Sequence, residues 1–172
     1  MKMLIKILLN FVMVTGVAQA STDTAVITVT GTVKNNTCSI DNSAPSFVLP
    51  DVSVRDFNGK ANTEISEVSI PVTFSNCGSD STGISVVVSG INDSDLSSGH
   101  GFKNSGTADG VAVVLYDTDG YKFKTDGTSR GVAIKPNAGL ASTTYKARYI
   151  STKENIKSGS VSTVITATFT YN

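Results

Sequence analysis

The stretch TAVITVTGTV, Thr24–Val33, constrains the fold of this chain more than any other. Its apolar and polar positions alternate and most of its residues are β-branched, which predicts an extended strand with one buried face. No turn signal follows that would fold it back as a hairpin before the first cysteine. The residues that share this face are Ala25, Ile27, Val29, Gly31 and Val33. Such a strand needs a partner strand, either in its own domain or in another chain.

Residues 1–20 have the pattern of a secretory signal peptide. A basic start with Lys2 and Lys6 precedes an apolar run, and the small residues Ala18 and Ala20 mark a cleavage site. The apolar run is shorter than the ~20 residues of a membrane-spanning helix, so we expect cleavage before Ser21 and no membrane insertion. The mature chain then divides into an N-terminal extension, residues 21–33, and a single domain, residues 34–172.

Composition and cysteine usage narrow the class of protein. The chain has 14 basic and 14 acidic side chains, whereas a nucleic-acid-binding protein would need a basic face, so we expect no nucleic-acid partner. Cys38 and Cys77 lie in the exported part, where an oxidising compartment favours their pairing as a disulfide. A metal or redox site is the weaker interpretation, because the chain has no CxxC and only one histidine, His100. We therefore expect no metal and no cofactor.

The rest of the chain consists of short strand patterns separated by turn signals. SEVSIPVTFSNC, GISVVVSGI, TTYKARYIS and VSTVITATFTYN each read as a strand, SFVLPDV as a short extended piece, and GVAVVLYDTDGYKF as a strand, a D-G turn and a returning strand. SDLSSGHGFKNSGTADG reads as a long polar loop. Many short strands with a cysteine pair predict an all-β sandwich of immunoglobulin-like character.

The sequence offers no convincing catalytic constellation. His100 lies in a Gly/Ser loop without a nucleophile motif, so we interpret it as a solvated loop residue. The acidic loops INDSD and YDTDG lack the closing glutamate of a calcium loop. We therefore expect no enzyme.

Two interpretations of the first strand remain open on periodicity alone. In one, the sandwich is complete and its first strand is long. In the other, the sandwich lacks a strand, and the N-terminal arm belongs in a neighbouring molecule.

A resemblance to a known family favours the second interpretation. The signal peptide, VITVTGTVKNNTCSI with Cys38, VTFSNC with Cys77, GVAVVLYDTDG, YKARY and the ending ATFTYN resemble chaperone–usher fimbrial subunits of the type 1 pilin family. The resemblance covers the mature chain. The short arm with GTVKNNTCSI is most similar to the minor tip-fibrillum subunits of that family.

The resemblance implies an incomplete immunoglobulin-like sandwich of six strands, whose seventh strand is supplied in trans. The arm would be the donor strand, through Ala25, Ile27, Val29, Gly31 and Val33. The acceptor groove beside the last strand would be lined by Val161, Ile165, Ala167, Phe169 and Tyr171. The terminal carboxylate of Asn172 would be held by basic residues of a chaperone.

The same resemblance implies partners and a location. A periplasmic chaperone would fill the groove first, and at an outer-membrane usher the arm of a neighbouring fimbrial subunit would replace it. The protein would be exported to the periplasm of a Gram-negative bacterium and then stand in a surface fimbria that supports adhesion. The alternative function is a stand-alone secreted β-sandwich that binds carbohydrate or a receptor. A surface cluster of aromatic loop residues would favour it, but the sequence has only scattered ones, such as Phe57, Phe102, Tyr121 and Phe123.

Overall fold

The computed structural model describes residues 28–43, 45–128 and 134–172. The expected signal peptide and two of the expected donor residues, Ala25 and Ile27, lie outside these ranges. The chain divides into two units between Thr32 and Val33, and the second unit holds every named strand. Within the described residues, no helix has the length and apolar character that crossing a membrane would require.

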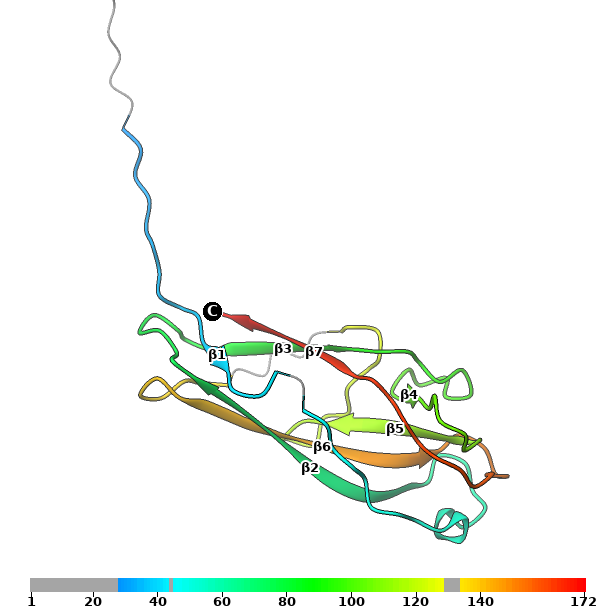
Figure 1. Cartoon of the computed structure of the whole chain (residues 1–172). Coiled ribbons are helices and arrows are strands. Elements are labelled where there is room, and N and C mark those ends of the chain that lie inside the picture. Colours follow the sequence, from blue (N-terminus) through cyan, green and yellow to red (C-terminus); the bar gives the residue numbers. More distant parts are fainter. Residues whose placement is uncertain (1–27, 44, 129–133) are drawn as a thin grey trace, which may run out of the picture. The chain divides into compact units, whose positions relative to one another are not determined.

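The domain is an all-β structure with strands in two sheets (Figure 1). One sheet has five strands in the order β1-β2-β6-β5-β4, and the other consists of β3 and β7 alone; all pairs are antiparallel. In chain order the elements are β1 (Ser39–Ile40), the 3-10 helix η1 (Val54–Phe57), β2 (Glu64–Ser75), β3 (Ile84–Ser89), β4 (Phe102–Lys103), β5 (Val111–Tyr116), β6 (Ala141–Ser151) and β7 (Thr166–Tyr171).

The alternation of the sequence places one face of each long strand in a common core. In β3 the buried residues are Ile84, Val86 and Val88, and in β6 they include Tyr145, Ala147 and Tyr149. Phe74 from β2 is 1% exposed, and its ring packs edge-on against Phe169 of β7 with ring centroids 5.0 Å apart. The core thus connects the two sheets, as the sandwich predicted from the sequence requires.

The turn predicted at YDTDG is confirmed, but the returning strand is not. Gly120 adopts φ 80° and donates its backbone N–H to the carbonyl of Asp117 at 3.1 Å, and the Asp117 side chain accepts from the backbone N–H groups of Asp119 and Tyr121. After the turn, the described pairing consists of the bridge between Tyr116 and Lys122, with backbone bonds from Asp117 N–H to the Tyr121 carbonyl at 3.0 Å and from Phe123 N–H to the Leu115 carbonyl at 2.9 Å. The turn chemistry is local, whereas the return would need a longer run of paired residues than this chain forms.

Three further expectations need correction. Residues 28–33 of the arm lie in no strand within the described chain, and neither does SFVLPDV, which is expected only as a short extended piece. β7 begins at Thr166, five residues after the predicted start at Val161. The loop read as polar contains Leu96 and Phe102, which are 3% and 0% exposed, and it includes β4; isolated apolar residues in a polar stretch gave no periodic signal.

The predicted disulfide between Cys38 and Cys77 is confirmed. It joins the residue before β1 to the segment after β2, next to the pairing of Ser39 with Ser75. Two backbone bonds lie close by, from Gly78 N–H to the Thr37 carbonyl at 2.9 Å and from Cys77 N–H to the Gly139 carbonyl at 3.0 Å. The disulfide therefore fixes the short β1 at the edge of the five-stranded sheet.

We expect the Cys38→Ala/Cys77→Ala double variant to unfold at lower urea concentration than the wild type. The disulfide closes a loop with a sequence separation of 39, which corresponds to about 4 kcal/mol in the chain-entropy account. Urea unfolding followed by circular dichroism measures the difference. Two free thiols in wild-type protein from the periplasm, or equal stability of the two proteins, would contradict this expectation.

Candidate functional site

A long apolar groove of about 1210 Å³ lies over the inner face of the five-stranded sheet. Strands β2, β5 and β6 supply its floor, one wall is the segment between β1 and η1, and the other is the segment that leads from β6 into β7. The floor residues are Val68, Ile70, Val72, Val111, Val113, Leu115, Tyr145, Ala147 and Tyr149. Because these side chains are the alternating inward residues of three long strands, the pattern that forms the core also forms the floor.

The first wall, residues 45–53, is extended chain outside any named strand. Among the residues that the structure describes, those from 45 to 52 form no hydrogen bond. Several of its apolar side chains are exposed, with Val48 at 85% and Phe47 at 38%. The wall ends at η1, where Ser53 and Asp56 form reciprocal capping bonds. This wall therefore offers free backbone groups and apolar side chains to a partner.

The second wall, residues 157–169, has a free backbone edge along β7. Within the described chain, β7 pairs with β3 and with no other strand. Its approach, residues 163–165, forms no hydrogen bond among the described residues, and Val164 is 80% exposed. The groove is thus bounded by two extended segments with unpaired backbone groups.

The expected acceptor residues occupy two different places. Val161, Ile165, Ala167 and Phe169 line the groove. Tyr171 is not among the lining residues; it packs against the core, with its ring 6.5 Å from that of Phe74.

The expected donor residues that the structure describes are uncovered. Val29 is 88% exposed and Val33 is 99% exposed. Gly31 has open space around it, because a Cβ atom at this position would have no other heavy atom within 4 Å.

The C-terminal residue is held to the domain by its backbone. Asn172 donates its N–H to the Gly83 carbonyl at 2.9 Å, and one oxygen of its backbone carboxylate accepts from the Thr82 N–H at 2.6 Å. These bonds continue the pairing of β7 with β3 to the last residue, so the terminal carboxylate has a fixed position.

Sequence reasoning missed the first wall and most of the floor. The signal for the wall was present in SFVLPDV, where apolar Phe47, Val48 and Leu49 precede Pro50, which cannot donate to a strand ladder. The floor also includes Tyr145, whose hydroxyl is buried without a partner among the described residues. Burial, with the nearby charge of Asp117, raises the pKa of this hydroxyl, so it stays neutral at physiological pH.

A groove of this kind can take up an extended chain. Apolar side chains of the chain would cover the floor, while its backbone would pair with the free edge of β7. No bond making or breaking is needed for this kind of binding.

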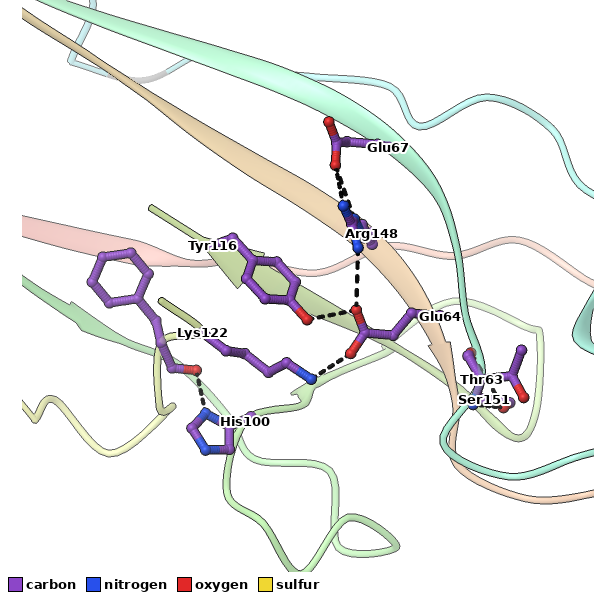
Figure 2. A network of polar contacts seen from close by, with 9 residues as sticks. Thr63, Glu64, Glu67, His100, Tyr116, Lys122, Arg148 and Ser151 are labelled. Atoms are coloured by element: carbon purple, nitrogen blue, oxygen red, sulfur yellow. Dashed lines mark hydrogen bonds and ion pairs between the residues drawn. The ribbon is translucent and has the colours of Figure 1, made fainter. Parts of the chain in front are cut away.

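A polar network covers the opposite face of the same sheet (Figure 2). Glu64 accepts from the Tyr116 hydroxyl at 2.6 Å and forms an ion pair with Lys122, and Arg148 donates to Glu67 at 2.6 and 2.9 Å. The Tyr116 ring lies 5.2 Å from the Arg148 guanidinium carbon and 5.3 Å from the Lys122 ammonium. Each of the charged side chains Glu64, Glu67, Lys122 and Arg148 has a partner of opposite charge, which is typical of a structural surface.

The remaining polar residues do not form a reactive site. The Nδ1 atom of His100 lies 3.0 Å from the carbonyl of Phe123, and Figure 2 shows it at a distance from the Ser151–Thr63 bond. Among the residues described, no cluster of His, Cys, Asp and Glu could hold a metal ion. Phe57, Phe102 and Phe123 are at most 2% exposed, and Tyr121 packs partly buried against the core, so these four residues form no exposed aromatic surface.

Comparisons with known proteins show a family and related folds. The sequence model of one family, described as Fimbrial protein, matches residues 27–172. A search of curated proteins found no sequence with significant similarity.

Solved structures share the fold. One is from a structure of a chaperone–usher pilus that concerns rod uncoiling, with 18% identity, a TM-score of 0.66, and coverage of 91% of this chain and 100% of the other. The P pilus rod subunit PapA has 19% identity, a TM-score of 0.64 and coverage of 78% and 99%. The CupB6 tip adhesin from Pseudomonas aeruginosa has 20% identity, a TM-score of 0.53 and coverage of 64%, and this chain spans 31% of its length. This likeness confirms the incomplete immunoglobulin-like fold.

We expect the polar network to make stability depend on acidity. Hydrogen bonds from Arg148 and Lys146 lower the pKa of Glu67 below 4.5. A lowered carboxyl pKa contributes stability at higher pH, and this contribution is lost as the pH falls through the folded-state pKa. In urea titrations from pH 7 to pH 3, Arg148→Gln should therefore lose less stability on acidification than the wild type. Lys103→Gln, which removes a charge outside the network, is the matched control, and an unchanged acid limb in Arg148→Gln would contradict the expectation.

Proposed function

The chain belongs to the fimbrial protein family, and we propose that its groove takes up the N-terminal arm of another subunit, so that subunits polymerise by donor-strand exchange. Members of this family are structural subunits of fimbriae, not enzymes. The observation that carries the proposal is the apolar groove with the free edge of β7 along one wall. An inserted strand would complete the sandwich that β3 and β7 leave open.

The arm has the properties that this groove requires. Ile27, Val29 and Val33 would each contribute about 1.5–3 kcal/mol when buried, and each hydrogen bond of the new ladder about 0.5–1.5 kcal/mol. Gly31 lies on the same face of the arm and lets its backbone approach the floor closely. Val161, Ile165, Ala167 and Phe169 would contact the arm directly, whereas Tyr171 would support the wall from the core side.

The proposed partners follow from the exposed groove. An uncovered strand edge beside an apolar floor promotes aggregation, so the subunit needs a temporary strand before it polymerises. A periplasmic chaperone would supply this strand, and basic residues of the chaperone would hold the carboxylate of Asn172. An outer-membrane usher would then be the place where the arm of the next subunit replaces the chaperone.

The separate positions of the arm and the groove in one subunit explain why subunits would form a fibre. The arm precedes Cys38 and the groove wall β7 ends the chain, so the donor and acceptor surfaces of one subunit are different. Such head-to-tail contacts give an open fibre and not a closed dimer. We place the subunit in a surface fimbria of a Gram-negative bacterium, and its short arm favours a minor tip-fibrillum position.

We expect a synthetic peptide of residues 24–34 to displace the chaperone from a chaperone–subunit complex, and an Ile27→Asp peptide to fail. The aspartate would bury an unpaired charge in the groove. The matched control is Thr28→Asp, which adds the same charge to the other face of the strand, and it should bind nearly as well as the wild-type peptide. Displacement is followed by native electrophoresis, and equal rates for the Ile27→Asp and Thr28→Asp peptides would refute the donor-strand assignment.

We also expect deletion of residues 21–32 to convert the protein into a terminator of fibre growth. The truncated chain keeps the groove and still accepts a strand, but it has no arm to donate. Added to wild-type subunits and usher in an assembly assay, it should shorten the fibres in proportion to its share, as measured by electron microscopy. Fibres of normal length that contain the truncated chain at internal positions would contradict the proposal.

A further inference from the structure

The second wall is attached to the domain from its outer side. Residues 157–162 lie beside residues 105–109, the segment between β4 and β5, and four backbone bonds of 2.8–3.2 Å join them. Asp109 and Lys157 each donate a backbone N–H to the carbonyl of the other. The N–H of Ala108 donates to the Ser160 carbonyl, and the N–H of Ser105 donates to the Ser162 carbonyl. The part of the wall that contains Val161 is therefore fixed from outside the groove.

The side chain of Asn104 is central to this attachment. Its Oδ1 accepts from the backbone N–H groups of Gly106 and Ser162, both at 2.8 Å. Its Nδ2 donates to the carbonyls of Ala108 at 2.8 Å and Ser160 at 3.4 Å. One amide group thus uses both of its ends to join the loop and the wall.

Thr107 and Ser160 form a second set of hydrogen bonds between the loop and the wall. The backbone N–H of Thr107 donates to the Ser160 hydroxyl at 3.1 Å, and the backbone N–H of Ser160 donates to the Thr107 hydroxyl at 2.9 Å. Gly106 and Gly159 allow the close approach, because an added Cβ would lie 2.2 Å from the Ser160 oxygen and 2.4 Å from the Ala108 nitrogen. We call Asn104, Thr107 and Ser160 the Asn104 clamp.

The clamp is the last fixed point of the wall before β7. Beyond Ser162, residues 163–165 form no hydrogen bond among the described residues, and the wall is held again only where β7 pairs with β3. Val161, inside the clamped part, packs against Phe57, Val111 and Tyr149 at one end of the groove. The position of the clamp therefore determines how far the wall stands from the floor at this end.

We propose that the Asn104 clamp is a positioning element that sets the depth of the groove and thereby the selectivity for the donor strand. This inference rests on the proposed strand exchange. An inserted strand pairs with the wall through its backbone, so the wall position decides how much room remains between that backbone and the floor. A fixed wall admits glycine at the arm position of Gly31 and discriminates against a larger residue, whereas a loosened wall accepts both.

The experiment compares two peptides on three forms of the full chain, each purified as its chaperone complex. The peptides span residues 24–34 with glycine or leucine at position 31, and the readout is the ratio of their uptake rates. Because each ratio is taken on one protein, general losses of stability and changes in chaperone release cancel. With the wild-type chain we expect the glycine peptide to enter about tenfold faster, since overpacking is the obstacle for leucine.

Asn104→Ala should reduce this ratio to less than about threefold, since the wall can then yield to leucine. Asn92→Ala is the matched control, because the Asn92 side chain also bonds to a backbone carbonyl and to Thr125 but lies outside the clamp; its ratio should equal that of the wild type. If Asn104→Ala gives no complex, Asn104→Asp keeps the two accepted bonds and loses the two donated ones, and an intermediate ratio is expected.

The outcomes separate the two proposals. An unchanged ratio in Asn104→Ala, or in Asn104→Asp where only that variant is obtained, overturns the role of the clamp and leaves strand exchange standing. A reduced ratio in Asn92→Ala as well would make the effect a general one and would also overturn it. If the wild-type chain takes up neither peptide, or both at the same rate, strand exchange by this arm fails, and the clamp proposal fails with it.

Discussion

The free backbone edge of β7 is the constraint on which the rest of this structure depends. A strand in a two-stranded sheet has a row of unpaired N–H and C=O groups along one side, and such groups need partners when apolar surface is buried around them. Among the described strands β7 pairs with β3 alone, and the apolar groove over the inner face of the five-stranded sheet lies beside it. The apolar floor and the free edge require the same thing, an extended strand that pairs with the groove side of the walls.

The two walls stay apart because the first is anchored at its ends and the second is anchored from its outer side. The first wall is anchored by the disulfide and β1 at one end and by the capped η1 with buried Phe57 at the other. The second wall is anchored by the Asn104 clamp and by the ladder with β3. Hydrogen bonds to the outer side of a wall leave its inner side available, so the domain can be rigid around a groove whose own backbone groups are unpaired.

The sequence predicted what depends on local alternation and failed where pairing depends on distant partners. Val68, Ile70, Val72 and Phe74 alternate in β2 as expected, and the Asp117–Gly120 turn follows from its own residues. By contrast, the apolar run at Val161–Ile165 reads as part of the last strand, yet pairing begins at Thr166 because the chain changes partners there, from residues 105–109 to β3. Asn104 gave no sequence signal, since two of its four bonds reach residues more than fifty positions away, Ser160 and Ser162. The wall at Phe47 and Val48 was missed because its residues are uncovered without periodicity.

The two faces of the five-stranded sheet show how one scaffold separates assembly from solubility. The outer face carries the charged residues Glu64, Glu67, Lys146, Arg148 and Lys122, which form ion pairs with one another. A second chain that bound to this charged face would bury the paired charges and remove their water. The free-energy cost of this dehydration makes binding there unfavourable. The inner face has no such charges, and the groove over it keeps exposed apolar side chains on its walls, Val48 and Val164. We therefore expect association to be directed to the groove, where an incoming chain can supply both hydrogen bonds and apolar side chains, and growth to proceed along the fibre and not sideways.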